Sequence, residues 1–272
     1  MLGFGGNPLI NIIANGEWKR ASQMIQDNGN LVRKWSVAPS LTGGVAAADI
    51  LPIHQASKMD TITVQFLESL LWAYPESLKK RETGFRRIAL HIAIRARAPE
   101  EVIFYILDKY PQGAAVQDVL GRVPLHYAIS NHSSMRVIQS LITICPATSR
   151  AADNLGWTPL HVASNMARSI EMVDILIECG AESVVSVTKK GNSPLMCATM
   201  SAGPDKNIII SRLMEEEAKF EKTAYFKNFR HAENEAMRSQ HYYNGRPNAP
   251  VHSIRFWGIR KLKRSNSFRL VV

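Results

Sequence analysis

Cysteine is scarce in this sequence, with three among 272 residues: Cys145, Cys179 and Cys197. Each lies in an apolar segment, and the number is odd. A fold held together by disulfides needs a higher density of paired cysteines, usually in a short secreted chain. We therefore expect three reduced, buried thiols in a reducing compartment.

Long apolar runs are also missing. No stretch of 18 or more apolar residues occurs, so the sequence predicts no transmembrane helix. The first residues lack a basic stretch followed by an apolar one, and we expect no secretory signal. These absences favour a cytoplasmic protein.

The motifs that carry common chemistry are absent as well. The sequence has no nucleophile elbow, phosphate-binding loop or zinc-protease helix. No pair of Cys or His has the spacing of metal ligands. We therefore expect a protein that is not an enzyme, with no catalytic residues, no metal, no cofactor and no small-molecule substrate.

Charge is unevenly distributed. The net charge is +10, but the segment from Lys219 onward holds twelve Lys or Arg against three Glu. Residues 1–218 hold 21 basic and 20 acidic groups. The chain therefore divides into a nearly neutral body and a basic tail, and the two need separate explanations.

The body contains an internal repeat. Its pattern is a small or apolar residue, usually Pro, an apolar residue, His, any residue and Ala. Successive copies begin 37, 35, 35 and 35 residues apart, and Met196 replaces His in the last one. A weaker copy begins at Asn7. The five copies are residues 51–56, 88–93, 123–128, 158–163 and 193–198.

A second helix signal follows each of the first four copies. After the second copy, for example, Val102, Ile103, Ile106 and Leu107 recur at spacings of three and four, which predicts one buried helix face. These helices should end where proline cannot continue a helix or glycine accepts the cap. The predicted ends are Pro75, Pro111, Pro146 and Gly180.

This arrangement resembles the ankyrin repeat, a turn followed by two antiparallel helices with a Thr-Pro-Leu-His-x-Ala signature. The resemblance covers roughly residues 50–215, and residues 153–161 match the signature most fully. The second copy departs from it, because Ile88 and Ala89 replace Thr and Pro. The loop before that copy is longer by two residues. The resemblance implies an all-α solenoid with helical caps and a basic C-terminal tail.

We assign physical roles to the residues of the signature. Pro presets the first helical turn, and Thr caps the start of the helix. The recurring His is interpreted as a hydrogen-bonding strut between neighbouring turns. Glycines in the turns supply backbone angles that other residues resist; they are Gly121, Gly156 and Gly191.

The expected boundaries follow from these signals. Residues 7–50 form an N-terminal helical cap or degenerate repeat, with a helix pair over 7–36 and an exposed loop of small residues over 37–48. One long helix is expected over 207–240, and its part beyond the repeats is the C-terminal helix at 219–242. A flexible basic tail follows at 243–272. The repeats span about 51–87, 88–122, 123–157, 158–192 and 193–218.

The family resemblance implies an adaptor or scaffold that binds a protein partner on the concave surface, through turn tips and the exposed side of each first helix. Trp157 is either a binding hot spot or a ring packed flat on the next turn. The basic candidates favour an acidic segment in the partner. Carried over by position, the candidates are Lys58, Met59, Arg95, Arg122, Ser130, Asn131, Asn154, Trp157, Asn165, Met166, Lys189, Lys190 and Asn192.

The tail offers an alternative function. It mixes basic and aromatic groups, which suit an anionic membrane, nucleic acid or a partner groove. Its last basic cluster also fits a nuclear localisation signal, with the nucleus as the alternative location. An unstructured solubilising tail is the simplest interpretation. The residues concerned are Arg255, Phe256, Trp257, Arg260, Lys261, Lys263 and Arg264.

Overall fold

The computed structural model describes residues 6–39 and 47–223. The chain divides into one unit of residues 1–216 and a second of residues 217–272. At the N-terminus, α1 (Pro8–Ala14) and α2 (Trp18–Asp27) form the expected helix pair, followed by the short 3-10 helix η1 (Gly29–Arg33). Two strands, β1 (Ser36–Pro39) and β2 (Ala47–Ile50), then pair antiparallel.

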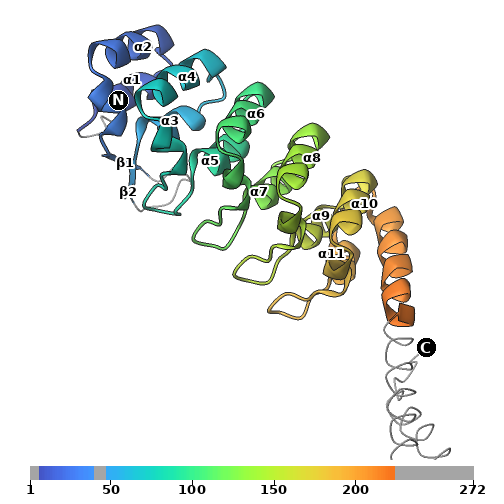
Figure 1. Ribbon diagram of the computed structural model, residues 1–272. Helices are drawn as coiled ribbons and strands as arrows, with labels where there is room; N and C mark the ends of the chain where they lie inside the picture. The colour runs from blue at the N-terminus through green and yellow to red at the C-terminus, as the bar shows by residue number, and fades with distance from the viewer. Residues whose placement is uncertain (1–5, 40–46, 224–272) are drawn as a thin grey trace, which may run out of the picture. The chain divides into compact units, whose positions relative to one another are not determined.

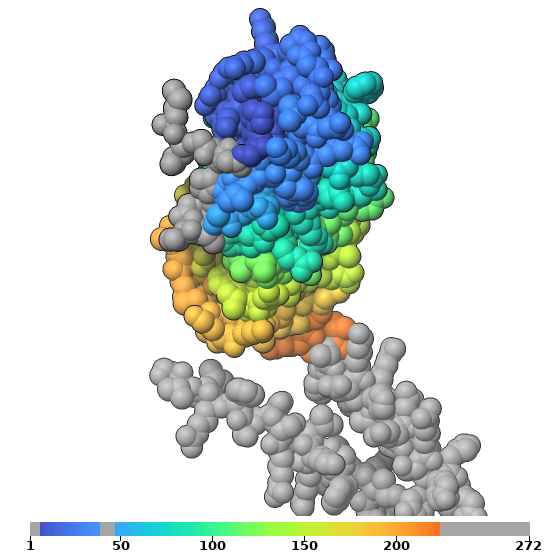
Figure 2. Space-filling view, turned by 90° about the vertical axis from the view of Figure 1, so that its left-hand side faces the viewer, coloured from blue at the N-terminus to red at the C-terminus, as the bar shows by residue number. Residues whose placement is uncertain are grey.

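Helix pairs make up the rest of the first unit (Figure 1). We call the first helix of each pair inner and the second outer. The inner helices pack in sequence, α3 on α5, α5 on α7, α7 on α9 and α9 on α11. In the space-filling view the repeats form adjoining bands from the N-terminal to the C-terminal end (Figure 2). The all-α solenoid is confirmed, and the two-stranded sheet is a small addition to it.

The bounds of the elements match the repeat pattern. The four complete pairs are α3 (Pro52–Ser57) and α4 (Val64–Ala73), α5 (Ala89–Ala96) and α6 (Glu100–Lys109), α7 (Pro124–Ser130) and α8 (Met135–Ile144), and α9 (Pro159–Met166) and α10 (Ile170–Cys179). The last pair is α11 (Pro194–Met200) and a helix over residues 206–223. The outer helices α4 to α10 are followed by η2 (Pro75–Lys79), η3 (Pro111–Ala115), η4 (Pro146–Arg150) and η5 (Ala181–Val185).

The predicted apolar face of the outer helices forms the core. Val102, Ile103, Ile106 and Leu107 of α6 are all buried, as the spacing predicts. Burying a side chain of this size contributes about 1.5–3 kcal/mol. One continuous cluster runs from Leu9 in α1 to Leu213 in the last helix, so each repeat covers the apolar face of its neighbour.

The recurring histidines connect successive turns, as we expected. The ring Nε2 atoms of His91, His126 and His161 lie 3.2, 2.9 and 3.0 Å from the carbonyl oxygens of Arg122, Trp157 and Asn192. His54 reaches Lys80 in the same way, at 3.0 Å. Each histidine therefore ties its own helix to the turn of the next repeat.

In three of the four histidines the other ring nitrogen, Nδ1, accepts a hydrogen bond from the N-terminal end of its own helix. The Nδ1 atoms of His54, His126 and His161 accept from the backbone N–H groups of Leu51, Val123 and Thr158. This pattern assigns the proton to Nε2, which donates to the carbonyl. Because protonating Nδ1 would break these bonds, the neutral ring is the form that the fold uses.

Burial lowers the pKa of these histidines. The pKa of His54 and of His91 falls to about 4, because desolvation penalises the charged ring more than the backbone carbonyl favours it. The pKa values of His126 and His161 are also lowered, with burial as the main cause.

We predict that acid destabilises the stack through these rings. The histidine rings of the unfolded chain titrate near pH 6.5. Below that pH the unfolded chain therefore binds protons that the folded chain does not bind, and this favours unfolding. Stability should fall between pH 6.5 and 4 by up to about 1.4 kcal/mol per pH unit for each of the His54 and His91 rings, and should not depend on these rings above pH 6.5. Urea unfolding at several pH values measures the slope.

The variant His54→Gln provides the control for this titration. It removes one titrating ring and should lower the slope by about one proton. Identical slopes for the wild-type chain and this variant between pH 6.5 and 4 would contradict the account.

Backbone hydrogen bonds join successive turns as well. The N–H groups of Val119, Asn154 and Lys189 donate to the carbonyl oxygens of Phe85, Leu120 and Leu155, at 2.8, 2.8 and 2.9 Å. The turn glycines have positive φ, +78° at Gly121 and +79° at Gly191. A Cβ on Gly121 would lie 2.8 Å from the backbone nitrogen of Asn154, whereas one on Gly191 would meet nothing within 4 Å.

These two glycines form a matched pair for a test. Gly191→Ala should cost about 1 kcal/mol, the strain of a left-handed alanine. Gly121→Ala should cost about 3 kcal/mol or more, because the next turn must also move away. Urea denaturation followed by circular dichroism measures both. Equal losses would show that the close approach of the turns is unimportant.

The structure corrects the exposed loop predicted for residues 37–48. Residues 36–39 and 47–50 form the β1–β2 hairpin, and the segment between them lies outside the described residues. Ala38 and Ala48 are buried beside Ile10 and Ile50. Their alternation along the strands places small side chains against α1, which turn-forming composition alone did not reveal.

The two additional residues between the first and second copies are also placed differently. Pro75 to His91 spans 16 positions where Pro111 to His126 spans 15, so one additional residue enters the turn. The other enters the link between α3 and α4, because His54 precedes Val64 by 10 positions and His91 precedes Glu100 by 9. The predicted two-residue lengthening of one loop was therefore wrong.

Candidate protein-binding surface

The inner helices and the turns before them form the surface that the sequence predicted for a partner, here called the inner surface. Of the predicted residues, Lys58, Arg95, Ser130, Asn154, Asn165, Lys189 and Lys190 are exposed. Met59, Arg122, Asn131, Trp157, Met166 and Asn192 are half-buried. The candidates thus include both exposed residues and half-buried residues that also pack within the fold.

Two of the half-buried candidates have clear structural contacts. Met59 packs against the core, and its sulfur lies 3.8 Å from the side-chain amide nitrogen of Gln55. Asn131 is the C-cap of α7. These contacts make Met59 and Asn131 weaker candidates for a partner than the fully exposed residues.

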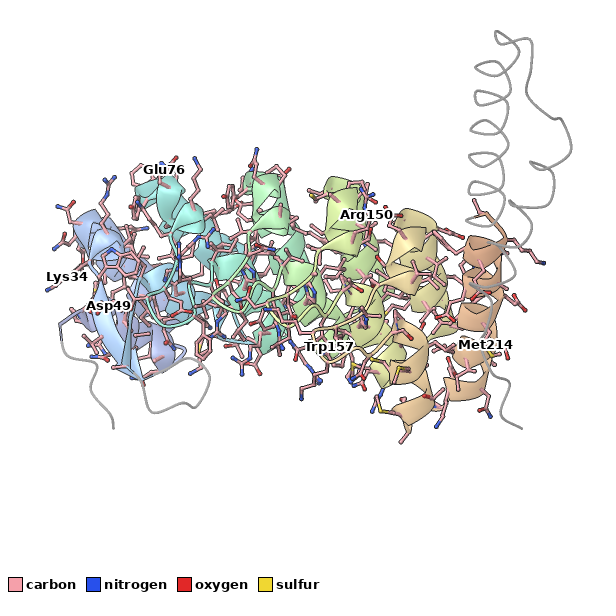
Figure 3. The ribbon with its side chains drawn as sticks, turned by 90° about the horizontal axis from the view of Figure 1, so that it is seen from below. Lys34, Asp49, Glu76, Arg150, Trp157 and Met214 are labelled. Carbon is pink, nitrogen blue, oxygen red and sulfur yellow. The ribbon has the colours of Figure 1, made fainter. Side chains whose placement is uncertain are left out.

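A pocket of about 200 Å³ brings three of the predicted residues together. Arg122, Ser130 and Trp157 line it, with His126, Asp153 and Val162. The pocket lies between the third and fourth repeats on the inner surface. In Figure 3, Glu76 and Arg150 lie along one side of the stack and Trp157 lies toward the other.

The structure shows the contacts of Trp157, and its role in binding stays a prediction. Its backbone carbonyl accepts from His126, and its backbone N–H donates to Asp153 at 2.9 Å. Its ring is tilted against that of His161, with 6.0 Å between the ring centroids. The ring therefore rests on its own repeat with one part covered, while another part lines the pocket.

Asp153 organises the turn that carries Trp157. Its Oδ1 accepts from the backbone N–H groups of Leu155 and Trp157, and its Oδ2 accepts from Arg122 Nε at 3.3 Å. The Asp153 carboxylate is buried, whereas the Arg122 side chain is 41% exposed. This ion pair fixes Arg122 at the mouth of the pocket and leaves part of its guanidinium open to a ligand.

In the preceding groove, Tyr127 takes the place that Val162 has beside the pocket. Tyr127 occupies the position after His126, where the next repeat has Val162 after His161. Its hydroxyl donates to Asp118 Oδ2 at 2.6 Å, and its ring meets His91 edge-on. Burial and the bond to Asp118 raise the pKa of Tyr127 to about 12, so the hydroxyl remains a donor.

A buried arginine lies in the turn before α5. Arg87 lies 4.2 Å from the centre of the Phe85 ring, and its Nε is 3.4 Å from Glu82. Burial lowers the pKa of Arg87. Tyr127 and Arg87 are therefore both buried beside α5 and α7, whereas the smaller Val162 lines the pocket at Trp157.

Sequence reasoning missed several exposed apolar residues. Val119, Leu120, Leu155 and Val187 lie at or beside the turns, and Leu155 and Val187 are 56% and 60% exposed. Trp72, on the outer helix α4, is 87% exposed. The sequence does carry a signal for them, which is apolar residues next to turn glycines, where polar residues are usual. The helical repeat pattern does not include these turn positions.

The predicted tail residues, Arg255 through Arg264, lie outside the described residues. In residues 6–39 and 47–223, no helix is long and apolar enough to cross a membrane. The same residues contain no cluster of His, Cys, Asp or Glu that suits a metal ion. All three cysteines are free; Cys197 is buried, while Cys145 and Cys179 are half-buried.

Residues 131–224 match the family model of ankyrin repeats, in three copies. Residues 131–224 therefore consist of ankyrin repeats. The matched residues include α8 to α11, and the same helix-pair geometry is present in α3 to α7.

The ankyrin fold also matches a solved structure. That structure is described as the predatory endopeptidase Bd0816 of Bdellovibrio bacteriovorus in complex with the immunity protein Bd3460. The match covers 77% of this chain and 98% of the solved chain, with a TM-score of 0.58 and 18% sequence identity. At this identity the likeness shows the fold alone. No curated protein matches the sequence.

We predict that Asp153 is the structural support of the pocket. Asp153→Ala leaves two backbone donors and Arg122 without their acceptor and should cost about 2–3 kcal/mol. Thr188 occupies the same position in the next turn but accepts one backbone bond, from Asn192 at 3.1 Å. Thr188→Ala should therefore cost about 1 kcal/mol. Thermal unfolding of both variants compares them, and a larger loss at Thr188 would contradict this ranking.

Proposed function

We propose that this ankyrin protein is a non-enzymatic adaptor or scaffold that holds a protein partner on its inner surface. The observation that carries the proposal is the open pocket between the third and fourth repeats, with Trp157 and Arg122 at its edge. Tryptophan and arginine dominate the binding energy of protein interfaces when they lie at a pocket. An apolar side chain of the partner is the natural occupant, because Val162 and two aromatic rings form the walls.

The surroundings of the pocket support the same function. Ser130 and Asn165 are exposed polar groups on the inner helices and suit the rim of an interface. Leu155 is an exposed apolar residue on the turn that carries Trp157. A polar rim around an apolar centre is the usual anatomy of a protein interface.

Charge adds a preference for the partner. Arg95, Lys189 and Lys190 are exposed on the inner surface, and Arg122 is partly open. These groups favour an acidic segment next to the apolar anchor, and they should speed association at low salt. The solved structure that shares this fold is itself a complex of two proteins.

We predict that filling the pocket abolishes partner binding without unfolding the chain. Val162→Tyr copies the arrangement of Tyr127, with Asp153 in place of Asp118 as the acceptor. Trp157→Ala instead removes one wall and should weaken binding by about 2 kcal/mol, roughly thirtyfold. Quantitative pulldown of the full chain from native lysate, at low and high salt, measures both variants.

The matched control is Gln139→Ala, on the exposed side of the outer helix α8. It should retain the partner fully. Circular dichroism shows whether Val162→Tyr remains folded. A partner that both pocket variants retain at high salt, with the fold intact, would refute the proposed site.

A further inference from the structure

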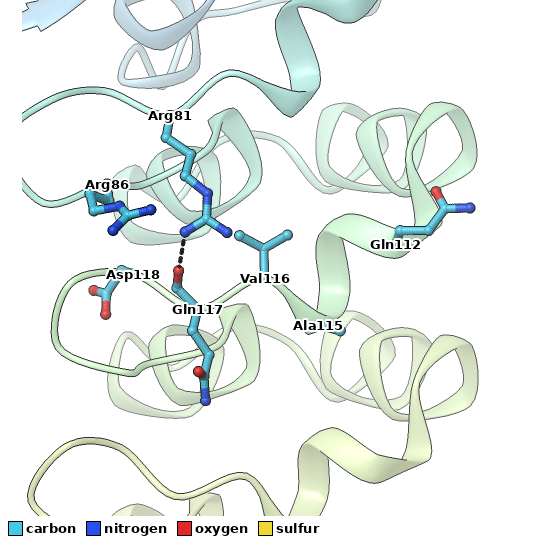
Figure 4. Close-up of a pocket in the computed structure, with 7 residues that line it drawn as sticks. All are labelled: Arg81, Arg86, Gln112, Ala115, Val116, Gln117 and Asp118. Carbon is cyan, nitrogen blue, oxygen red and sulfur yellow. Dashed lines mark hydrogen bonds between the residues drawn. The ribbon is translucent and has the colours of Figure 1, made fainter.

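A second cavity lies between the turn that precedes α5 and the segment that precedes α7. It has a volume of about 490 Å³ and is lined by Arg81 and Arg86 from one turn (Figure 4). Gln112, Val116, Gln117 and Asp118, from η3 and the following segment, form the opposite wall. This cavity and the pocket at Trp157 share no residue.

Two arginines bring uncompensated charge to this cavity. Arg81 Nη1 donates to the carbonyl oxygen of Gln117 at 2.7 Å, which holds the guanidinium across the opening. Neither Arg81 nor Arg86 forms an ion pair within the described part of the chain, and both are exposed. Two guanidinium groups therefore line the cavity with N–H donors that a ligand can use.

Asp118 is the acidic group in the wall, and its oxygens are already occupied. Oδ1 accepts from the backbone N–H groups of Leu120 and Arg122, at 2.8 and 2.9 Å. Oδ2 accepts from the Tyr127 hydroxyl at 2.6 Å. Because these donors satisfy the Asp118 carboxylate, it competes weakly for Arg81 and Arg86.

The backbone at Arg86 carries strain that its sister turns avoid. Arg86 has a φ of +57°, and it stands five positions before His91. Gly121 and Gly156 stand five positions before their own histidines, and both also have positive φ. A left-handed residue with a side chain costs about 1 kcal/mol relative to glycine. Backbone strain of this kind clusters at functional sites, where the side chain has a role.

We propose that this cavity binds an oxyanion, the carboxylate or phosphoryl group of an acidic protein segment. The guanidinium fork of arginine matches both groups and binds either with two parallel hydrogen bonds. Gln112 and Gln117 line the same cavity, and in Figure 4 their side-chain amides point away from the two arginines. Arg86 replaces the turn glycine because its charge is needed at this position.

This site is separate from the proposed partner site on the inner surface. The cavity is lined by the turn before α5, η3 and the segment after η3, whereas the pocket at Trp157 is lined by residues of α7 and α9 and of the turns before them. Either proposal can therefore fail alone. A ligand at the cavity would be sensitive to ionic strength, because both arginines are exposed.

The test titrates the full chain with three probes: inorganic phosphate, a hexaglutamate peptide and a peptide containing one phosphoserine. Isothermal titration calorimetry at low salt measures affinity, and the two peptides distinguish a carboxylate ligand from a phosphoryl ligand. Arg81→Gln and Arg86→Gly should each weaken the better-binding probe about tenfold or more. Arg86→Gly should also keep or raise thermal stability, because glycine relaxes the turn.

Arg168→Gln is the charge-matched control, since Arg168 is exposed in the link between α9 and α10. It should bind the probes like the wild-type chain. Equal weakening by Arg168→Gln would show nonspecific attraction to net positive charge and would overturn the proposal. So would the absence of binding by all three probes at millimolar concentration, or unchanged binding in both cavity variants.

Discussion

The histidine that joins each inner helix to the next turn is the interaction on which the rest of the stack depends. Its Nδ1 accepts from the start of its own helix in three of the four repeats, and its Nε2 donates to a carbonyl of the following turn in all four. One neutral ring thus satisfies two buried backbone groups that would otherwise cost free energy. The rings fix the spacing of the turns.

The two ends of the stack show what replaces this bond. In the N-terminal repeat Ile10 stands where histidine would be, and the β1–β2 hairpin covers it with Ala38, Ala48 and Ile50. An apolar contact there replaces the hydrogen bond. In the last repeat Met196 replaces histidine and is 48% exposed. No further turn follows it in the described residues, so a histidine would have no carbonyl to reach.

With the turns fixed in this way, one position of the inner surface differs between the third and fourth repeats. The residue after the histidine is Tyr127 in the third repeat and Val162 in the fourth. Tyr127 reaches the turn carboxylate of its own repeat and is buried. Val162 is too short to do so, and the matching carboxylate of Asp153 binds Arg122 instead. The same framework therefore holds a buried tyrosine at one repeat and a pocket beside a valine at the next.

The sequence predicted the fold well because the repeat is local. The Pro, His and Ala spacing and the three-and-four periodicity depend on contacts within one repeat or with its neighbour. The hairpin was missed because its small residues resemble a loop until α1 is placed beside them. The left-handed conformation of Arg86 was missed because an arginine in the place of the turn glycine has no distinct sequence pattern.

The candidate site was predicted only in part, for a different physical reason. Position in the repeat identified Arg122, Ser130 and Trp157, which do line one pocket. It could not tell where a pocket forms, because that depends on how far side chains such as Tyr127 and Arg87 extend between repeats. It also placed Met59 and Asn131 at the surface, although both make contacts within the fold.

The most direct test of the account is site-specific crosslinking from the pocket at Trp157. A photoreactive phenylalanine is placed at position 130, beside the pocket, or at position 139, on the exposed side of α8, in the full chain. After irradiation in native lysate, the account predicts that one defined protein is crosslinked from position 130 and not from position 139. Crosslinks from position 139 alone, or identical products from both positions, would contradict it.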